Sequence, residues 1–517
     1  MQIKKGILEG IRILDLSRML SGPYATMMFS DHGAEVIKVE DIHGDSSRRS
    51  GPFRKDDEHK EWAGYFVSLN RNKKSVSLNL KNDADKSHFK ELVKTVDILI
   101  ENFRPGVMKR LGFSFNHLKE INPQLVYGSI TGFGLKEFGE SPYSNWPSYD
   151  VVAQAMGGLI SLTGFDDENL LKVGPGVADI FSGSLMSFGL LAALIKAKKT
   201  GVGQLVEISM YDAIISMCER AIYQFDLTGK VPKPDGNGHP LLAPFGIYKA
   251  SDGFIAIGIV EDSYWNVLKN IVLDKRFLDD TKYGTISLRA KNRYLLNSIL
   301  NEWTVKYKKN DLLKLLGGKV PFGPVNDASE IFNDAHVKKR KSVIEIEHFK
   351  PNLSPWRVAA NPVRFEGYGL KLNRPPKLGE HNKQLLPKTR NDKKNKNRER
   401  QKYFSSSHRC YLHCQDSKKN QLLVICDSFN WIERKFSYLT CLIEGNNLNN
   451  AKVTNAKELR FFFLDERNLE QIKYLENLVK SSDFSEKHLK TFDVFLGKNN
   501  KIEEFGKDLI VISQINK

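Results

Sequence analysis

The chain of 517 residues is poor in cysteine: it has five, too few for a disulfide scaffold, and this scarcity suits a reducing compartment. It also lacks a long hydrophobic run. The longest one, from Ile180 to Ile195, contains three Ser and two Gly, is short for a membrane span and predicts a buried helix. The first ten residues contain two lysines but no apolar signal core, and no Arg/Ser-rich transit peptide is readable. We expect a cytoplasmic protein with no membrane partner; a eukaryotic source would also allow the mitochondrial matrix.

The common cofactor and nucleophile motifs are missing as well. Gly132-Phe-Gly134 lacks the third glycine of a dinucleotide fingerprint, and Lys319 lacks the first glycine of a P-loop. The G-x-S-x-G elbow of serine hydrolases is absent. Four cysteines lie in the C-terminal part, Cys410, Cys414, Cys426 and Cys441, with His408 and His413 nearby. A structural zinc site usually combines two close pairs of ligands, whereas only Cys410 and Cys414 form a close pair here. We therefore predict no metal and no tightly bound cofactor.

The chain is rich in basic residues, with 78 Lys and Arg against 61 Asp and Glu and a net charge of +17. Residues 1–387 have 53 basic and 44 acidic residues, and residues 388–517 have 25 and 17. Residues 388–402 alone have eight basic and two acidic residues, which is typical of a solvated linker. A nucleic-acid-binding or scaffold protein is one alternative, but aromatic residues do not interleave with this run and no nucleic-acid-binding module is readable. A mildly basic body also suits a polyanionic small molecule.

Hydrophobic periodicity indicates an α/β fold. Short β-rich runs start roughly 20 to 40 residues apart and alternate with helix-compatible segments, which is typical of βα units on a largely parallel sheet. The predicted strands are 11–16, 35–39, 76–80, 97–100, 125–130 and 204–209. A helix rich in small residues is expected over residues 180–196, and basic residues followed by Gly201 mark its end.

The pattern changes after about residue 225. Pro and Gly residues between 232 and 240 predict a loop, and Ser251-Asp-Gly253 between two alternating runs predicts a β-hairpin. We predict a large domain over 1–224, a smaller α+β domain over 225–330, a return to the large domain over 331–387, the linker 388–402 and an α/β-like domain of unknown function over 403–517. In that last domain we predict strands at 421–426, 459–464, 492–496 and 509–513, and a helix over 468–480.

An ordered series of motifs runs through the first 387 residues. They are Leu8-Glu-Gly-Ile-Arg-Ile-Leu-Asp-Leu16, Ser21-Gly-Pro-Tyr-Ala25, Gly33-Ala-Glu-Val-Ile-Lys-Val-Glu40, Gly44-Asp45, Asn70-Arg-Asn-Lys-Lys-Ser75, Asp97-Ile-Leu-Ile-Glu-Asn-Phe-Arg-Pro-Gly106, Ser129-Ile-Thr-Gly-Phe-Gly134, Gly176-Val-Ala-Asp-Ile-Phe-Ser-Gly183, Gly236-Asn-Gly-His-Pro240, Pro321-Phe-Gly-Pro-Val325 and Leu378-Gly-Glu-His381. Together they resemble the family III CoA-transferases, the CaiB/BaiF type that includes formyl-CoA transferase and carnitine CoA-transferase. The resemblance stops at the basic linker.

The resemblance implies a Rossmann-like large domain, built from both ends of this region, and a small domain between them. It also implies a homodimer in which two chains are threaded through one another, an exceptional arrangement that a single sequence does not show. Acyl-CoA and a free carboxylic acid would be the substrates, with coenzyme A as a substrate rather than a resident cofactor. Succinyl-CoA with a hydroxy- or dicarboxylic acid would suit, since many relatives use such pairs, but no residue selects among the acids.

By the same resemblance Asp179 is the nucleophile. A carboxylate with an ordinary pKa of about 3.9 is ionised at neutral pH without a base, and it can attack a thioester because the CoA thiol, with a pKa of about 8.5, leaves readily as the thiolate. The products would be an acyl-aspartyl anhydride and then an aspartyl-CoA thioester. Without the resemblance, Asp179 would read as the N-cap of the following helix.

The resemblance also implies the residues that bind coenzyme A. The predicted contacts are Leu20, Ser21, Leu78, Asn79, Leu80, Lys81, Asn102, Phe103, Arg104 and Arg110, with Arg110 contacting a phosphate. Asp41 stands where formyl-CoA transferase has an arginine near the adenosine, and Lys38, Arg48, Lys73 or Lys74 are candidates to compensate.

Two loops complete the predicted site. Glycine-rich backbone can approach an oxyanion closely, which makes the loop of Gly236, Asn237, Gly238 and His239 the candidate donor. Tyr149 and Asp150 would lie beside the thioester. Racemases of the same fold use a His at the position of Tyr149 and need two acid–base groups, so a transferase is favoured over an acyl-CoA racemase, isomerase or CoA-dependent lyase.

Overall fold

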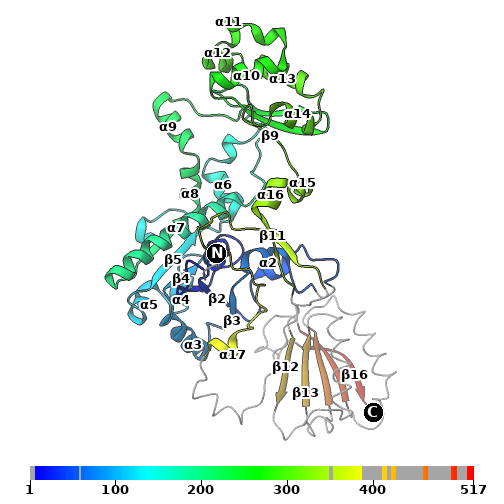
Figure 1. The fold of residues 1–517 in the computed structure, drawn as a ribbon. Coiled ribbons are helices and arrows are strands. Elements are labelled where there is room, and N and C mark those ends of the chain that lie inside the picture. Colours follow the sequence, from blue (N-terminus) through cyan, green and yellow to red (C-terminus); the bar gives the residue numbers. More distant parts are fainter. Residues whose placement is uncertain are drawn as a thin grey trace. The chain divides into compact units, whose positions relative to one another are not determined.

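The structure, a computed structural model, describes residues 6–57, 60–348 and 353–386 and five strands between residues 410 and 516. The chain divides into two compact units, Met1–Pro387 and Lys388–Lys517, and each is described by itself (Figure 1). The finer domain boundaries at residues 224, 330 and 402 stay predictions.

The first unit is built on a six-stranded sheet in which every neighbouring pair is parallel. Its strands are β1 (Arg12–Asp15), β2 (Glu35–Glu40), β3 (Lys74–Ser77), β4 (Ile98–Glu101), β5 (Val126–Thr131) and β6 (Leu205–Ser209). The spatial order β3-β2-β1-β4-β5-β6 is that of the Rossmann fold, so the predicted α/β class with a parallel sheet is confirmed. In this topology the strand order reverses between β1 and β4, and ligands bind beyond the carboxyl ends of the strands there.

Helices cover both faces of this sheet, which explains why a central strand such as β4, Ile98-Leu-Ile-Glu101, is largely apolar and buried. Ile13 of β1 packs into a core with Phe29, Met186 and Leu190, whereas the next residue, Leu14, packs into a second core on the opposite face. The first core is covered by α1 (Ser21–Asp31), α6 (Asp150–Met156), α7 (Val177–Thr200) and α8 (Met210–Met217). The second is covered by α3 (Asp83–Val93), α4 (Val107–Arg110) and α5 (Phe115–Ile121).

Strand β3 and helix α7 differ from their predicted bounds. The predicted strand 76–80 lies two to three residues too late, because Leu78 is buried in the second core beyond the end of β3 and so extends the apolar pattern. Helix α7 begins at Val177, and Gly176 is its N-cap. Asp179 therefore lies inside the first turn, and the reading of Asp179 as the N-cap is wrong.

Helix α7 is the one helix in the described part of the chain that is long and apolar enough to cross a membrane. Its buried residues, among them Met186 and Leu190, pack on the sheet, and α1 lies beside it. Phe188 and Ile195 on its other side are 75% and 58% exposed. It therefore acts as a covering helix of the sheet within this unit, and its second apolar face is left open.

The predicted hairpin after residue 225 is present. It consists of β7 (Phe245–Ala250) and β8 (Gly253–Gly258), which also pairs with β9 (Phe322–Pro324). A separate hydrophobic core around Trp265, Phe277 and Leu300 supports these strands. The helices here are α9 (Glu219–Thr228), which leads to this part, and α10 (Asp262–Val272), α11 (Asp280–Tyr283), α12 (Ile286–Lys291), α13 (Arg293–Thr304) and α14 (Lys309–Leu316).

The chain then returns to the beginning of the sheet. The backbone N–H of His381 donates to the carbonyl of Ser75, and that of Ser77 donates to the side chain of Asn382 at 2.9 Å, so this segment covers the edge strand β3. The elements of this returning segment are α15 (Ala328–Asn333), α16 (Ala335–Arg340), β10 (Val343–Ile346), β11 (Trp356–Ala359) and α17 (Asn382–Leu385). The N-terminal part also contains α2 (Gly64–Asn70), which lies between β2 and β3 in the chain.

The second unit contains a five-stranded mixed sheet with parallel pairs β13–β14 and β14–β15 and antiparallel outer strands. The strands are β12 (Cys410–Gln415), β13 (Gln421–Cys426), β14 (Glu458–Phe463), β15 (Thr491–Gly497) and β16 (Leu509–Asn516). Four of them were predicted, and β12, with the sequence Cys-Tyr-Leu-His-Cys-Gln, was missed. The predicted helix 468–480 lies outside the described residues.

Candidate active site

Asp179 lies at the carboxyl edge of the sheet, in the first turn of α7. Because its N-cap is a glycine, the free N–H groups of this helix need another acceptor. Asp150 at the start of α6 provides it: one oxygen accepts from the backbone N–H of Ala178 at 2.7 Å and from that of Asp179 at 3.3 Å. Gln154 donates to the other oxygen of Asp150 at 2.6 Å. Asp150, predicted as an active-site residue, thus caps the helix that bears Asp179.

The carboxylate of Asp179 faces the start of α1. The hydroxyl and the backbone N–H of Ser21 act on it as donors that favour its ionised form and lower its pKa. Two glycines permit this approach: a Cβ at Gly183 would lie 2.5 Å from the Ser21 carbonyl oxygen, and a Cβ at Gly176 would lie 2.6 Å from a methyl group of Leu20. Helix α7 therefore presents Asp179 to Ser21 because its first turns are free of side chains on this side.

The site changes the acidity of Asp179. Burial, and second the negative charge of Asp150, raise the pKa of Asp179 to about 6, although the two hydrogen bonds from Ser21 act in the opposite direction. The sequence alone suggested that Asp179 has the ordinary aspartate pKa of about 3.9. A carboxylate with this higher pKa is still mostly ionised at neutral pH, and it is a more basic group than a solvent-exposed aspartate.

Tyr65 of α2 is a site residue that the sequence analysis missed. Burial and the negative charges of Asp179, Asp45 and Asp150 raise the pKa of Tyr65 to about 12, so its phenol stays protonated. A protonated hydroxyl near Asp179 can donate a hydrogen bond to an oxyanion. No pattern around residue 65 signals this, because Tyr65 reaches the site only through the packing of α2.

The loops after β1 and β4 are joined where the strand order reverses. The side-chain oxygen of Asn102 accepts from the backbone N–H of Arg18 at 2.8 Å, and its amide donates to the Arg18 carbonyl and to the Ser21 hydroxyl. The guanidinium of Arg18 pairs with Asp41 and lies over the ring of Phe103. The structure thus brings together the predicted residues Ser21, Asn102 and Phe103, and adds the exposed cation Arg18.

The other predicted coenzyme A contacts follow β1, β3 and β4 at the same edge, and Arg110 among them is the last residue of α4. Leu78 is buried in the core and Leu20 and Asn79 are half-buried, whereas Arg104 and Arg110 are exposed. Lys81 is exposed and Leu80 is half-buried after β3. Their contacts with coenzyme A stay predictions.

The compensating role considered for four basic residues is wrong for two of them. The side chains of Lys38 and Lys73 have no exposed surface. The ammonium group of Lys38 bonds to Ser17 and Asp45. That of Lys73 bonds to Asp15, Thr26, Pro23 and Asn70. Arg48 and Lys74 pair with Glu40 and Glu35. Buried, bonded ammonium groups have no path to a phosphate, whereas Arg18 in the loop after β1 is exposed.

The loop of residues 236–239 contacts both parts of the first unit, since the N–H of Ile247 on β7 donates to the carbonyl of Asn237. The N–H of Gly236 donates to the carbonyl of Gly164, and the ring of His239 contacts Arg220 at 2.9 Å. Burial first, and then the charge of Arg220, lower the pKa of His239. Within the described residues of one chain, none of the hydrogen bonds of this loop reaches Asp179, and Tyr149 is 73% exposed. The oxyanion role of the loop stays a prediction.

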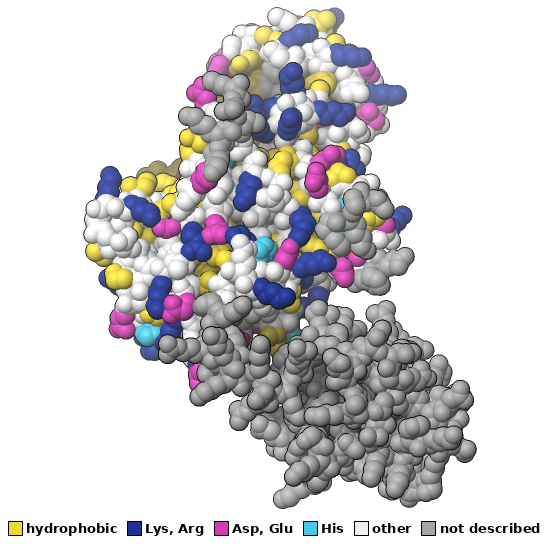
Figure 2. Space-filling view, turned by 60° about the horizontal axis from the view of Figure 1, so that its bottom comes forward, with side chains coloured by type: hydrophobic (Ala, Val, Ile, Leu, Met, Phe, Trp, Pro, Cys, Tyr) yellow, Lys and Arg dark blue, Asp and Glu magenta, His cyan; other side chains and the backbone are white. Residues whose placement is uncertain are grey.

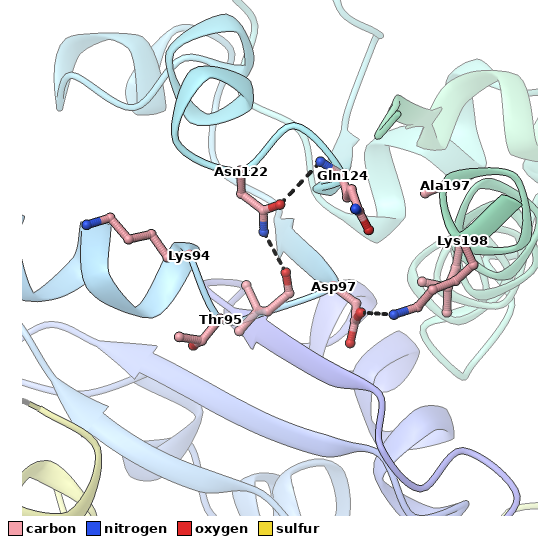
Figure 3. A pocket seen from close by; sticks show the side chains of 9 residues that line it. Lys94, Thr95, Asp97, Asn122, Gln124, Ala197 and Lys198 are labelled. Carbon is pink, nitrogen blue, oxygen red and sulfur yellow. Dashed lines mark hydrogen bonds and ion pairs between the residues drawn. The ribbon is translucent and has the colours of Figure 1, made fainter. Parts of the chain in front are cut away.

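A cavity of about 300 Å³ lies at the opposite edge of the sheet, before β4 begins (Figure 3). Its two lysines are engaged: Lys198 pairs with Asp97 at 2.6 Å, and Lys94 pairs with Glu91. On the face in Figure 2, Lys and Arg side chains are interspersed with Asp and Glu. Both lysines of this cavity are therefore already paired with carboxylates, and the candidate site remains the carboxyl edge, where Asp179 lies.

The chain is similar to known proteins. The sequence model of CoA-transferase family III matches residues 8–382. A succinyl-CoA:mesaconate CoA-transferase of Haloarcula marismortui is 39% identical over 74% of this chain and 96% of its own, and a succinate–glutarate CoA-transferase of Agrobacterium fabrum is 34% identical over 74% and 96%. A crystal structure of a CaiB/BaiF family protein from Brucella suis has a TM-score of 0.65 and 35% identity, covering 73% of this chain and 98% of its own.

The resemblance predicted from the motifs is therefore confirmed. The matched residues contain the parallel sheet, Asp179 and both loops that meet at its carboxyl edge. They end before the basic linker, so the second unit is outside the match. The chain belongs to CoA-transferase family III and is a CoA-transferase that moves CoA between acyl-CoA thioesters and carboxylic acids.

Proposed function

We propose that transfer proceeds through covalent intermediates on Asp179. The Asp179 carboxylate attacks the thioester carbonyl, the C–S bond breaks, and an acyl-aspartyl anhydride and CoA thiolate form. The thiolate attacks the aspartyl carbonyl, which releases the first acid and leaves an aspartyl-CoA thioester. The carboxylate of the second acid attacks this thioester, which expels the CoA thiolate and forms a second acyl-aspartyl anhydride. The thiolate then attacks the acyl carbonyl of the second acid, which gives the new acyl-CoA and frees Asp179.

The environment of Asp179 is the observation that carries this proposal. A nucleophile that needs no base must be ionised at the working pH, and a pKa of about 6 meets this condition while keeping the carboxylate basic. Ser21 and Tyr65 supply donors beside it. The tetrahedral intermediates require donors of this kind where negative charge develops.

We propose succinyl-CoA and a dicarboxylic acid as the substrates. The support is the naming of the relatives, one a succinyl-CoA:mesaconate and another a succinate–glutarate CoA-transferase. The exposed cations Arg18, Arg104 and Arg110 at the carboxyl edge suit the phosphates of coenzyme A.

We also propose that the active form is a homodimer. Large apolar side chains are exposed along one face of α7 and on α9, a pattern typical of a surface that a partner covers. They are Phe188, Ile195, Ile222, Tyr223, Phe225 and Leu227. Sedimentation at micromolar protein is expected to give twice the chain mass, and a monomer at that concentration would contradict the proposal.

Trapping the intermediate tests the mechanism. The full chain is incubated with succinyl-CoA and quenched with hydroxylamine, which converts an aspartyl anhydride or thioester into a hydroxamate. We expect mass spectrometry of the peptides to place the hydroxamate on Asp179. The rate of its formation should fall about tenfold per pH unit below pH ~6, because the protonated carboxyl does not attack. A hydroxamate on another residue, or none during active turnover, would contradict the proposal.

A further inference from the structure

An ion pair with no exposed surface lies beneath the loop that contacts Asp179. The ammonium group of Lys38 on β2 is 2.9 Å from a carboxylate oxygen of Asp45, and both side chains are at most 1% exposed. Lys38 was a candidate for a coenzyme A phosphate, a role that its burial rules out, and neither residue forms a hydrogen bond or ion pair with Asp179 among the described residues. Such a pair contributes little to stability compared with apolar side chains of the same volume, which raises the question of what it does.

The pair holds the backbone of the loop at two points. Lys38 donates to the carbonyl of Ser17 at 2.8 Å, and the second oxygen of Asp45 accepts from the backbone N–H of Met19 at 3.3 Å. Met19 has a φ of 62°, which is unfavourable for a residue with a side chain. The two bonds lie on either side of Arg18 and keep the chain in this conformation.

A second buried pair holds the same loop from its other side. Asp15 accepts from the N–H and the hydroxyl of Ser17, and Lys73 pairs with Asp15 at 3.0 Å and donates to the carbonyl of Pro23. The segment from Ser17 to Pro23 is therefore tied to buried charges before and after Ser21. Only the first pair touches Met19, the residue in the unfavourable conformation.

This conformation decides where Ser21 lies. Two residues after Met19, the chain turns into α1 at Ser21, and this turn lies against α7, since a Cβ at Gly183 would be 2.5 Å from the carbonyl oxygen of Ser21. The N–H and hydroxyl of Ser21 act there as donors that favour the ionised Asp179. We infer that Lys38 and Asp45 are positioning residues for the transfer reaction: by holding Met19 in the left-handed conformation, they aim the two donors of Ser21 at Asp179. The inference rests on the proposed role of Asp179 as the nucleophile.

The test distinguishes a variant that is slow because Ser21 is displaced from one that is slow because the chain does not fold. Replacing one partner would leave a buried unpaired charge, whereas the double variant Lys38→Met/Asp45→Leu removes both charges and keeps an apolar interior. The matched control is Arg71→Met/Asp31→Leu, since that pair is equally buried but lies at the far end of α1. Far-ultraviolet circular dichroism and thermal melting establish that both double variants fold before their transfer rates are compared.

We expect the Lys38→Met/Asp45→Leu variant to fold like the control and to form the hydroxamate about 100-fold more slowly, because displaced donors cost this much in rate. Its acid limb should also move above pH ~6, since the bonds from Ser21 lower the pKa of Asp179 and would be lost. The other groups that face Asp179, Asp150 from α6 and Tyr65 from α2, are unchanged. A rate and an acid limb equal to those of the control would overturn the inference.

A second variant covers the case in which the double variant does not fold. Met19→Val leaves the buried charges intact and introduces a β-branched side chain, which opposes the positive φ that the pair imposes. We expect a folded enzyme with about tenfold slower hydroxamate formation and the same direction of shift in the acid limb; a wild-type rate and limb would overturn the inference. In every variant the peptide that bears the hydroxamate is identified, so a hydroxamate outside Asp179 would refute the proposed mechanism, and a slow reaction on Asp179 would not.

Discussion

Asp179→Asn is expected to lower CoA transfer by about 10⁴-fold or more, since the reaction loses its nucleophile and no neighbouring carboxylate is placed to replace it. Asp150 is the nearest candidate, but its oxygens are occupied by the N–H groups of α7 and by Gln154. Steady-state transfer from succinyl-CoA to a dicarboxylic acid measures the loss. Asp311→Asn, which changes an exposed aspartate in the first turn of α14, is the control and should keep the wild-type rate.

Asp179→Asn should also make the protein more stable. The pKa of Asp179 is raised in the folded chain, so the folded state binds more protons than the unfolded state between about pH 4 and 6. Its contribution to stability is therefore present below pH 4 and lost as the pH rises through 6. At neutral pH the ionised group costs on the order of 2 kcal/mol after allowance for its partial exposure, and asparagine removes this cost. Thermal melting at pH 7.5 should give a higher Tm, and the gain should vanish at pH 4; a lower Tm at both would contradict the prediction.

Gly183→Ala is expected to cost both stability and activity, although alanine is favoured over glycine in a helix by up to about 1 kcal/mol. A Cβ at this position would lie 2.5 Å from the carbonyl oxygen of Ser21, and backbone cannot move aside as a side chain can. Helices α1 and α7 must separate, at a cost of about 1–3 kcal/mol. The separation moves Ser21 from Asp179, so we expect a transfer rate about 100-fold lower.

Ser184→Ala is the matched control for Gly183→Ala. Ser184 is the next residue of α7 and is exposed, and its hydroxyl donates to the carbonyl of Ile180 within the same helix. It should keep the wild-type rate and melting temperature. If Gly183→Ala instead melted higher than the wild type and kept its rate, the close approach of α1 and α7 would not matter to the site.

The sequence led to the fold class and to Asp179 for two different reasons. The regular return of apolar runs predicted a parallel sheet, because strands covered on both faces are apolar throughout. Asp179 followed from the order of the motifs around it and not from its own position, which alone suggested a helix cap. The sheet, whose order is that of the Rossmann fold, and the family match bear out both the fold class and the family.

Other residues could not be assigned from the sequence. Lys38 and Lys73 were read as candidates for phosphate binding, since a lysine is usually exposed, but both are buried and paired. Tyr65 gave no signal at all. Ser21 was predicted from the resemblance as a coenzyme A contact, and its two donors are engaged by Asp179.

The sequence by itself determined what kind of protein this is: the period of its apolar residues and the order of its motifs are local or linear properties, and they are readable without coordinates. Only the tertiary structure decided what each charged group does. The raised pKa values of Asp179 and Tyr65 and the pairing of Lys38 with Asp45 depend on burial and on charges that come from distant parts of the chain. Electrostatic energy depends on distance in space and on access to water, and neither is a property of position along the chain.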